Sequence, residues 1–408
     1  MVVDRAGGLL GPLQRYTRTA GALAQGWARR LEALAPALAD GAEARDREGR
    51  LPRENVRLLA AEGYPALTVP TQAGGAGAGL RDMCLLQEIL AMADGPTALG
   101  LGWHLSLMLG VRASGAWPAA VRDRVYRRVV AEGALVNSCA TERETGSPSR
   151  GGRPTTRAEA LGDGRYRLSG RKTFATFSPA LTWYLVTASL EDGAIGEFLI
   201  EAGTPGVDVD RTWDSFGMRA SESHDLVLEG AVVGGDALVD RFTPPGRARR
   251  SADAGGPLLH VPACYLGIAL AARRDLLAFA WSHRPNSLPG PIAELSQVED
   301  QIGRIDLALL SANALLFDAA AAWDAADEAG RGGLRGLMGA AKVAGTEAAV
   351  RAVDLAMRVV GGHSLARSLP FERYYRDVRA GLHNPPMGDV ALRALGRGAL
   401  EASRPATS

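Results

Sequence analysis

The chain has 408 residues, of which 47% are hydrophobic and 22% are charged. This composition predicts sizeable buried cores and excludes a disordered or fibrous protein. Because 46 basic residues nearly balance 45 acidic ones, neither nucleic acid nor an anionic membrane is expected as a partner. Three dispersed cysteines without C-x-x-C spacing predict a reduced, cytoplasmic setting, and we expect neither a signal peptide nor a membrane-spanning helix.

The sequence pattern changes twice along the chain. Residues 1–134 are rich in Ala, Leu, Glu and Arg at helical spacing, which predicts an N-terminal helical domain. Residues 135–242 contain short β-favouring runs separated by Gly, Asp, Ser and Pro, which predict a mostly antiparallel β-domain. After a loop rich in Pro, Gly and Arg, residues 243–408 return to long Ala/Leu helices. The expected class is α+β, with helices before and after the β-domain.

Four separated segments carry short motifs whose order and spacing are informative. They are A-T-E-R-E-T-G-S at 140–147, G-R-K-T-F-A-T at 170–176, W-D-S-F-G-M-R-A-S at 213–221, and G-G-H at 361–363 followed by Glu372-Arg373 and Arg376-Asp377. Together they resemble the acyl-CoA dehydrogenase family of flavoproteins over nearly the whole chain. The resemblance implies an N-terminal α-helical domain, a central β-barrel domain and a C-terminal four-helix bundle.

The resemblance also implies FAD bound between the β-domain and the bundle, in a homodimer or homotetramer whose neighbouring subunit reaches the cofactor. A flavin needs hydrogen-bond donors at its pyrimidine edge and a flat wall against its ring. The residues matching these roles are Thr141 and Thr176 as donors, Phe174 as the wall, Arg284 for the pyrophosphate, and Gly361 and Gly362 for the adenosine diphosphate part. Ser147 matches a residue that meets the thioester substrate.

The base that acyl-CoA dehydrogenation requires is missing from both positions where the family carries a glutamate. Aligned without gaps, these positions are Pro385 and Pro257, and proline also lacks the backbone N–H that helps to hold the thioester carbonyl. A register slip of about one helical turn would bring Asp389 there instead. His383 is the titratable residue nearest to Pro385, and we expect it to be a catalytic base.

Two further histidines are candidates for the same site. His104, on a helix that borders the substrate cavity in the family, is a second catalytic candidate, and His260 a substrate-binding one. Each of the three histidines has an alternative interpretation as a hydrogen-bonded packing residue. The G-W-H-L and L-H-N-P segments around His104 and His383 also resemble the dibenzothiophene monooxygenase branch of the fold, in which histidines act on the oxygen chemistry of a reduced flavin.

Three functions therefore stay open. The first is an FAD-dependent α,β-dehydrogenation of an acyl-CoA with a non-standard base, with an electron acceptor as partner. The second is a flavin-dependent monooxygenase acting on a small aromatic, amine or sulfur compound, with a flavin reductase as partner. The third is a non-catalytic member that binds flavin or CoA. The intact Thr141-Glu142 turn favours the first, although Pro148 stands where dehydrogenases usually have Asp.

Overall fold

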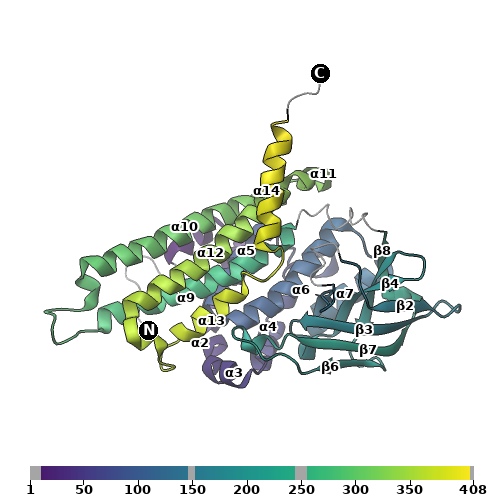
Figure 1. Ribbon diagram of the computed structural model, residues 1–408, viewed down its shortest axis with the longest axis horizontal. Helices are drawn as coiled ribbons and strands as arrows, with labels where there is room; N and C mark the ends of the chain where they lie inside the picture. The colour runs from purple at the N-terminus through teal and green to yellow at the C-terminus, as the bar shows by residue number, and fades with distance from the viewer. Residues whose placement is uncertain (1–10, 146–151, 244–254, 405–408) are drawn as a thin grey trace.

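The computed structural model describes residues 11–145, 152–243 and 255–404, and it shows the predicted order of helices, sheet and helices (Figure 1). The first block is helical. Its helices are α1 (Gln14–Thr19), α2 (Ala22–Ala39), α3 (Ala42–Glu48), α4 (Arg53–Ala61), α5 (Leu80–Ala93), α6 (Gly95–Ser114) and α7 (Ala119–Glu132).

Helix α6 shows how local sequence sets these bounds. Asp94 caps its N-terminus by accepting a hydrogen bond from the backbone N–H of Thr97 at 2.8 Å, which satisfies one of the donors left free at a helix start. The same carboxylate pairs with the buried Arg45 at 2.9 Å, so the cap also ties α3 to α6. The helix ends where Gly115 turns the chain with a φ of 59°.

The central block is one mixed sheet. Its strands are β1 (Val136–Cys139), β2 (Arg157–Ala160), β3 (Tyr166–Ala175), β4 (Trp183–Leu190), β5 (Ile195–Glu201), β6 (Val207–Asp210), β7 (His224–Val233) and β8 (Leu238–Phe242). Their order is β6-β7-β3-β2-β4-β5-β8, and β1 pairs with β4. Most pairs are antiparallel as expected, but β4 runs parallel to both β1 and β2. Each of these two parallel pairings joins strands that are distant in sequence.

The last block begins with the short 3-10 helix η8 (Gly256–Leu259) and continues in helices. They are α9 (His260–Ser282), α10 (Ser296–Ala325), α11 (Glu328–Arg331), α12 (Arg335–Val360), α13 (Phe371–Ala380) and α14 (Gly388–Ala402). In Figure 1, α9, α10 and α12 lie side by side, and α14 extends away from the body. Helix α14 exposes three leucines, Leu392, Leu395 and Leu400.

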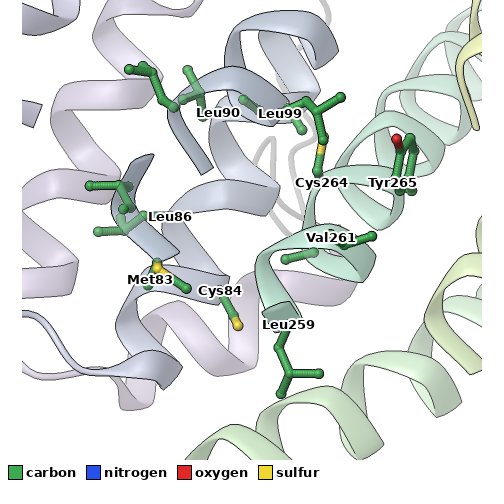
Figure 2. Packing of buried hydrophobic residues seen from close by; sticks show 14 of the residues in the cluster. Met83, Cys84, Leu86, Leu90, Leu99, Leu259, Val261, Cys264 and Tyr265 are labelled. Atoms are coloured by element: carbon green, nitrogen blue, oxygen red, sulfur yellow. The ribbon is translucent and has the colours of Figure 1, made fainter. Parts of the chain in front are cut away.

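A continuous apolar core joins the first block to the last. Figure 2 shows Met83, Cys84, Leu86 and Leu90 of α5 in this core, together with Leu259 and the α9 residues Val261, Cys264 and Tyr265. Gly267 permits the close packing, since a Cβ there would stand 2.3 Å from the backbone oxygen of Glu88. The interface between α5 and α9 is therefore part of the main core, and it fixes the bundle against the N-terminal helices.

Helix α10 bears on the expectation that the chain has no membrane-spanning helix. It is 30 residues long and apolar enough to cross a membrane by length and composition alone. Leu309 and Leu316 are buried in the bundle, whereas Leu307 and Leu310 are exposed. Asp306 forms an ion pair with Arg273 of α9. Packing in the bundle accounts for the apolar residues on the buried side of the helix.

Candidate functional site

A cavity of about 1540 Å³ lies where α6, the sheet and the last block meet. The first block contributes α6 positions such as Trp103, Leu107 and Gly110, and the sheet contributes residues near 137–143, 173–176 and 212–225. The last block contributes η8, α12, α13 and the segment leading into α14. The cavity is large enough for a cofactor together with a small substrate.

Glu142 organises the turn that follows β1. Its carboxylate accepts hydrogen bonds from the backbone N–H groups and hydroxyls of Thr155 and Thr156, and from the ammonium group of Lys172 at 2.6 Å. Burial alone would raise the pKa of Glu142, but the hydrogen bonds from Lys172 and Thr156 outweigh it and lower the pKa to about 2. This carboxylate is a fixed structural anion, which holds Thr141 at the cavity wall.

Thr176 presents a hydroxyl whose proton has no acceptor among residues 11–145, 152–243 and 255–404. Its oxygen accepts a hydrogen bond from Ser223 at 3.0 Å, and the oxygen of Ser223 lies 2.8 Å from that of Ser221. Because Ser223 uses its proton on Thr176, Ser221 donates to Ser223, and the proton of Thr176 stays available. All three residues line the cavity, so the chain of hydroxyls supplies a donor to a ligand there.

Phe174 sits in a strained backbone conformation. Its φ is 58°, which bulky residues adopt rarely, and its side chain is 60% exposed although it is aromatic. Its ring meets the ring of Trp213 edge to face at 6.1 Å, and both residues line the cavity. Such strain concentrates at functional sites, and the exposed ring offers a flat apolar surface to a ligand.

The G-M-R segment joins the sheet to the last block. A Cβ on Gly217 would stand 2.1 Å from the backbone oxygen of Arg376, so only glycine permits this approach. The backbone N–H of Met218 donates to the carboxylate of Asp377 at 2.5 Å. Burial, together with the nearby charge of Asp46, raises the pKa of Asp377 to about 7. This seam fixes the two sides of the cavity relative to each other.

The two positions that lack the family's glutamate both line the cavity. Pro257 lies in η8, and Pro385 follows α13. His383 also lines the cavity and is exposed; its role as a base stays a prediction. The next residue, Asn384, accepts a hydrogen bond from the hydroxyl of Tyr265 at 2.5 Å, which anchors this segment to α9. Asp389 instead pairs with Arg393 on the exposed side of α14.

The structure corrects the prediction for His104. The residue is fully buried, its Nε2 lies 3.0 Å from the backbone oxygen of Pro65, and its Nδ1 accepts from the backbone N–H of Val136. Burial lowers its pKa to about 4 despite these two hydrogen bonds. The cavity face of α6 carries positions such as 103, 107 and 110, so His104 lies about 100° away around the helix. It is a packing residue.

His260 also lies behind the cavity wall. It is fully buried, and its ring packs edge to face against Trp103 at 4.6 Å. Neither of its ring nitrogens has a hydrogen-bond partner within the described residues, and burial lowers its pKa to about 3. Trp103 lines the cavity and His260 does not, so the structure does not support the predicted contact with substrate.

Three predicted cofactor residues lie away from the cavity, at the far end of the bundle. Arg284 follows α9, and Gly361 and Gly362 follow α12; all three are exposed. Their neighbours His283 and His363 have ring centroids 5.2 Å apart, so the two segments are adjacent. Their contact with FAD across a subunit boundary stays a prediction. Ser147 lies outside the described residues.

Several cavity residues were missed by the sequence reasoning. Ser223 and Trp213 belong to the loop before β7, where no alternation of polar and apolar residues indicates which side chains face a site. Lys342 lies within an Ala-rich helix and also lines the cavity. The composition of the chain could have drawn attention to Lys342, because the chain has two lysines, Lys172 and Lys342.

The α-β-α order, with a cavity that offers hydroxyl donors and a flat aromatic wall, is suited to a protein that binds a planar cofactor. The family models for the acyl-CoA dehydrogenase N-terminal, middle and C-terminal domains match residues 31–117, 137–231 and 260–382. The protein named "Putative acyl-CoA dehydrogenase YdbM" from Bacillus subtilis (strain 168) is 45% identical over 92% of this chain and 97% of its own length. The chain therefore belongs to the acyl-CoA dehydrogenase family, and it is a flavoprotein oxidoreductase.

Other relatives are named for different reactions. Amino sugar nitrososynthase DnmZ of Streptomyces peucetius is 31% identical over 86% of this chain and 87% of its own length. KijD3, solved with FMN and a dTDP-linked amino sugar, is 28% identical with a TM-score of 0.80, covering 95% of this chain and 96% of its own. TdsC of Paenibacillus sp. A11-2, a dibenzothiophene monooxygenase solved with FMN and indole, shares the fold at 24% identity and a TM-score of 0.83, covering 94% and 98%.

The residues present fit a flavin. Thr176 offers a free hydroxyl proton, Phe174 an exposed ring, and Thr141 lies on a turn held by the buried Glu142. These are the residues that would hold the ring system between the sheet and the last block. When bound, the flavin supplies the redox chemistry, and the protein supplies binding, orientation and electrostatics.

Proposed function

We propose that this chain is a flavin-dependent monooxygenase that oxidises a nitrogen or sulfur atom of a small molecule. One observation carries the proposal. Within the described residues, the wall of the cavity formed by the last block has proline at both positions of the family's base, Pro257 and Pro385, and includes no acidic side chain. The likeness to a nitrososynthase at 31% identity supports the same class of reaction.

The chemistry explains why a missing carboxylate matters. Dehydrogenation of a thioester begins with removal of an α-proton, so it needs a positioned base. Oxidation of an amine or a sulfide uses the lone pair of the heteroatom instead and needs no such base. One atom of O₂ is transferred to the substrate and the other leaves as water, while a reduced flavin provides two electrons. A partner reductase is proposed to supply that reduced flavin.

His383 is proposed to move a proton in this reaction. Its side chain is exposed to the cavity, and the segment that carries it is fixed by the hydrogen bond between Tyr265 and Asn384. Formation of water from one oxygen atom needs protons, and a histidine can donate them near neutral pH. In this proposal His383 is the proton donor of the site.

A second candidate function is the acyl-CoA dehydrogenation itself, with His383 as the base. The relative at 45% identity bears the name of an acyl-CoA dehydrogenase, and the turn at Thr141 is intact. The two candidate functions differ in the flavin that we expect. The dehydrogenase is expected to bind FAD. The monooxygenase is expected to bind FMN, since the solved relatives KijD3 and TdsC are complexes with FMN. Equilibrium binding of FMN and FAD to the apoprotein compares them directly.

We also propose that the chain forms a homodimer or homotetramer. Helix α14 extends from the body with Leu392, Leu395 and Leu400 exposed, and contiguous exposed apolar side chains are typical of protein interfaces. Sedimentation equilibrium of the wild type and of Leu392→Glu measures the state. A wild type that stays monomeric at micromolar concentration contradicts this proposal.

The test of the reaction uses two arms on the flavin-loaded protein. In the first, ¹⁸O₂ and enzymatically reduced flavin are supplied with a panel of amines, thioethers and indole, and product mass is measured. In the second, acyl-CoA compounds are added without oxygen, and the absorbance of the oxidised flavin is followed. We expect one ¹⁸O atom in a product and no bleaching. Bleaching by an acyl-CoA, with no labelled product, would transfer the assignment to the dehydrogenase.

The role of His383 is tested by His383→Gln, with Asp389→Asn as the control. A positioned proton donor contributes about 10² to 10⁴ in rate, so we expect His383→Gln to lose that factor in product formation while it binds flavin normally. Asp389 faces outward on α14 in an ion pair, and its variant should keep the wild-type rate. Equal rates for wild type and His383→Gln contradict the role of His383.

A further inference from the structure

Lys342 is a buried lysine whose ammonium group has no partner in the part of the chain that the structure describes. It lies on α12 at 1% exposure and lines the cavity beside Met338 and Gly339. Within the described residues, no hydrogen bond or ion pair involves its ammonium group. The other lysine of the chain, Lys172, is equally buried but has Glu142 at 2.6 Å. Lys172 is therefore neutralised by Glu142, whereas Lys342 is accessible to a ligand in the cavity.

An unpaired ammonium group is costly in such a place, because burial removes its hydration without a compensating charge. The desolvation lowers the pKa of Lys342 to about 8, and Glu347 on the same helix opposes the change only through its distant charge. At neutral pH the group is therefore still mostly a cation. A protein keeps such a cation where a ligand supplies the missing anion.

The surrounding wall has the same sign of charge. Every charged side chain that the last block contributes to the described cavity lining is basic; these are Arg335, Lys342, Arg376 and Arg379. Arg376 is neutralised by Asp46 and Glu372. Arg379 donates to Tyr375, but its buried Nε has no partner within the described residues. Lys342 and Arg379 thus leave this side of the cavity with uncompensated positive charge.

The two missing carboxylates strengthen the argument. Pro257, Pro385 and Lys342 all belong to the lining that the last block contributes, so an acid at either proline position would have added a negative charge to that lining. In its described lining, the wall that the last block contributes has this cation and no acidic side chain. The acidic side chains of the described lining lie on the sheet side of the cavity; these are Glu142, Glu197, Asp214, Asp225 and Asp240. On the wall of Lys342, an anion that enters with a ligand would compensate its charge.

We propose that Lys342 forms an oxyanion subsite, in which its ammonium group binds a carboxylate or phosphate group of a molecule held in the cavity. The proposal deepens the function proposed above, since it rests on a small molecule occupying this cavity. Two sources share the required chemistry: an acidic group on the substrate, and the phosphate of the flavin. In either case Lys342 selects ligands by charge and takes no part in the redox step.

The experiment measures binding, so it does not depend on turnover. In the substrate arm, flavin-loaded protein is titrated with hexanoate and with the uncharged hexanamide, and the change in flavin absorbance is followed. In the flavin arm, apoprotein is titrated with FMN and with riboflavin, and the quenching of flavin fluorescence is followed. Both arms use the wild type, Lys342→Met, Lys342→Arg and the control Arg165→Met. Arg165 is exposed in the turn between β2 and β3, away from the cavity lining.

We expect the wild type to bind the anion at least tenfold more tightly than its neutral counterpart in one arm. Lys342→Met should remove that preference, Lys342→Arg should keep part of it, and Arg165→Met should leave it unchanged. The arm in which the preference disappears identifies the source of the anion. No preference in the wild type in either arm, or a preference that survives in Lys342→Met, overturns the proposal. Failure of the monooxygenase assay affects neither readout.

A measurement on the wild type alone guards against a variant that does not fold. Reductive methylation followed by mass spectrometry reports the accessibility of Lys342, with Lys172 as an internal reference. We expect saturating hexanoate or FMN to reduce methylation of Lys342 at least fivefold, while the matched hexanamide or riboflavin does not. Equal methylation with the charged and the neutral ligand contradicts the subsite.

Discussion

The ammonium group of Lys172 lies 2.6 Å from Oε1 of Glu142, and both side chains are completely buried. The pair joins β3 to the turn after β1, and both residues stand next to positions that line the cavity, Thr173 and Thr141. A second link runs beside it, because the backbone N–H of Thr173 donates to the backbone oxygen of Thr141 at 2.9 Å. At this place the cavity wall is thus held by an ion pair together with a backbone hydrogen bond.

Removing one partner of this pair should destabilise the fold strongly. Glu142→Gln leaves the ammonium group of Lys172 buried without an anion, and such changes cost about 3 to 5 kcal/mol. We expect a loss of that size in the free energy of unfolding by urea, together with weaker flavin binding. The control is Glu201→Gln, whose exposed pair with Arg128 should be worth less than about 1 kcal/mol. Similar losses in the two variants contradict the special role of Glu142.

The same pair predicts acid sensitivity with a defined sign. The pKa of Glu142 is lowered to about 2 in the folded protein from an ordinary value of 4.5. Its stabilising contribution is complete above pH 4.5 and is lost as the pH falls from 4.5 towards 2, because the unfolded chain takes up the proton first. The difference in unfolding free energy between wild type and Glu142→Gln should shrink over that interval. A constant difference contradicts the assigned shift.

The hydroxyl chain that ends at Thr176 predicts a graded effect on flavin binding. Thr176→Val removes the donor, and one net hydrogen bond is worth about 1 kcal/mol, so the dissociation constant should rise about fivefold to tenfold. Ser223→Ala removes only the group that orients Thr176, and we expect a smaller rise. Thr204→Val, in the turn before β6, is the control. If Ser223→Ala binds flavin like the wild type, the orienting role of Ser223 is wrong.

The architecture was predictable from sequence because the change in residue pattern is large. Helical spacing gives way to short β-favouring runs near Leu135 and returns after the loop that follows Phe242, and the structure has β1 beginning at Val136 and β8 ending at Phe242. The strand order was not predictable. Strand β4 pairs in parallel with β1 and β2 through contacts between distant segments, and local propensity carries no information about such pairings.

The site was predictable only in part, for a geometric reason. Motifs located Thr141, Phe174, Thr176 and His383, and all four line the cavity. His104 was misplaced because a helix presents one face to the cavity, and a position one residue from Trp103 turns away from it. Lys342 was missed because its importance comes from the absence of a neighbouring anion, which only the packed structure reveals.

The backbone strain at Phe174 predicts that a substitution relieving it raises the stability of the apoprotein and weakens flavin binding. Asparagine tolerates a positive φ better than a large aromatic residue, so Phe174→Asn should raise the unfolding free energy of the apoprotein by up to about 1 kcal/mol. It should also weaken flavin binding about tenfold, because the exposed ring is lost. Phe174→Val is the matched variant: its β-branch makes the positive φ worse, so the apoprotein should be less stable. The opposite order of stabilities contradicts strain at this position.

His104 predicts a second interval of acid sensitivity, which begins at a higher pH than that of Glu142. Burial lowers its pKa from 6.5 to about 4, so the folded protein resists a proton that the unfolded chain accepts. Its contribution is complete above pH 6.5 and is lost as the pH falls from 6.5 to 4, by about 3 kcal/mol.

The measurement is the difference in unfolding free energy between wild type and His104→Gln, since the amide keeps a donor and an acceptor for Pro65 and Val136 without titrating. Taking the difference also removes the contribution of Asp377, whose pKa is raised to about 7 and whose stabilising contribution is therefore lost as the pH rises. We expect the wild type to be the more stable of the two at pH 7, and its advantage to shrink by about 3 kcal/mol at pH 4. An advantage that stays constant between these pH values would mean that His104 is protonated in the folded protein, and its assignment as a neutral packing residue would be wrong.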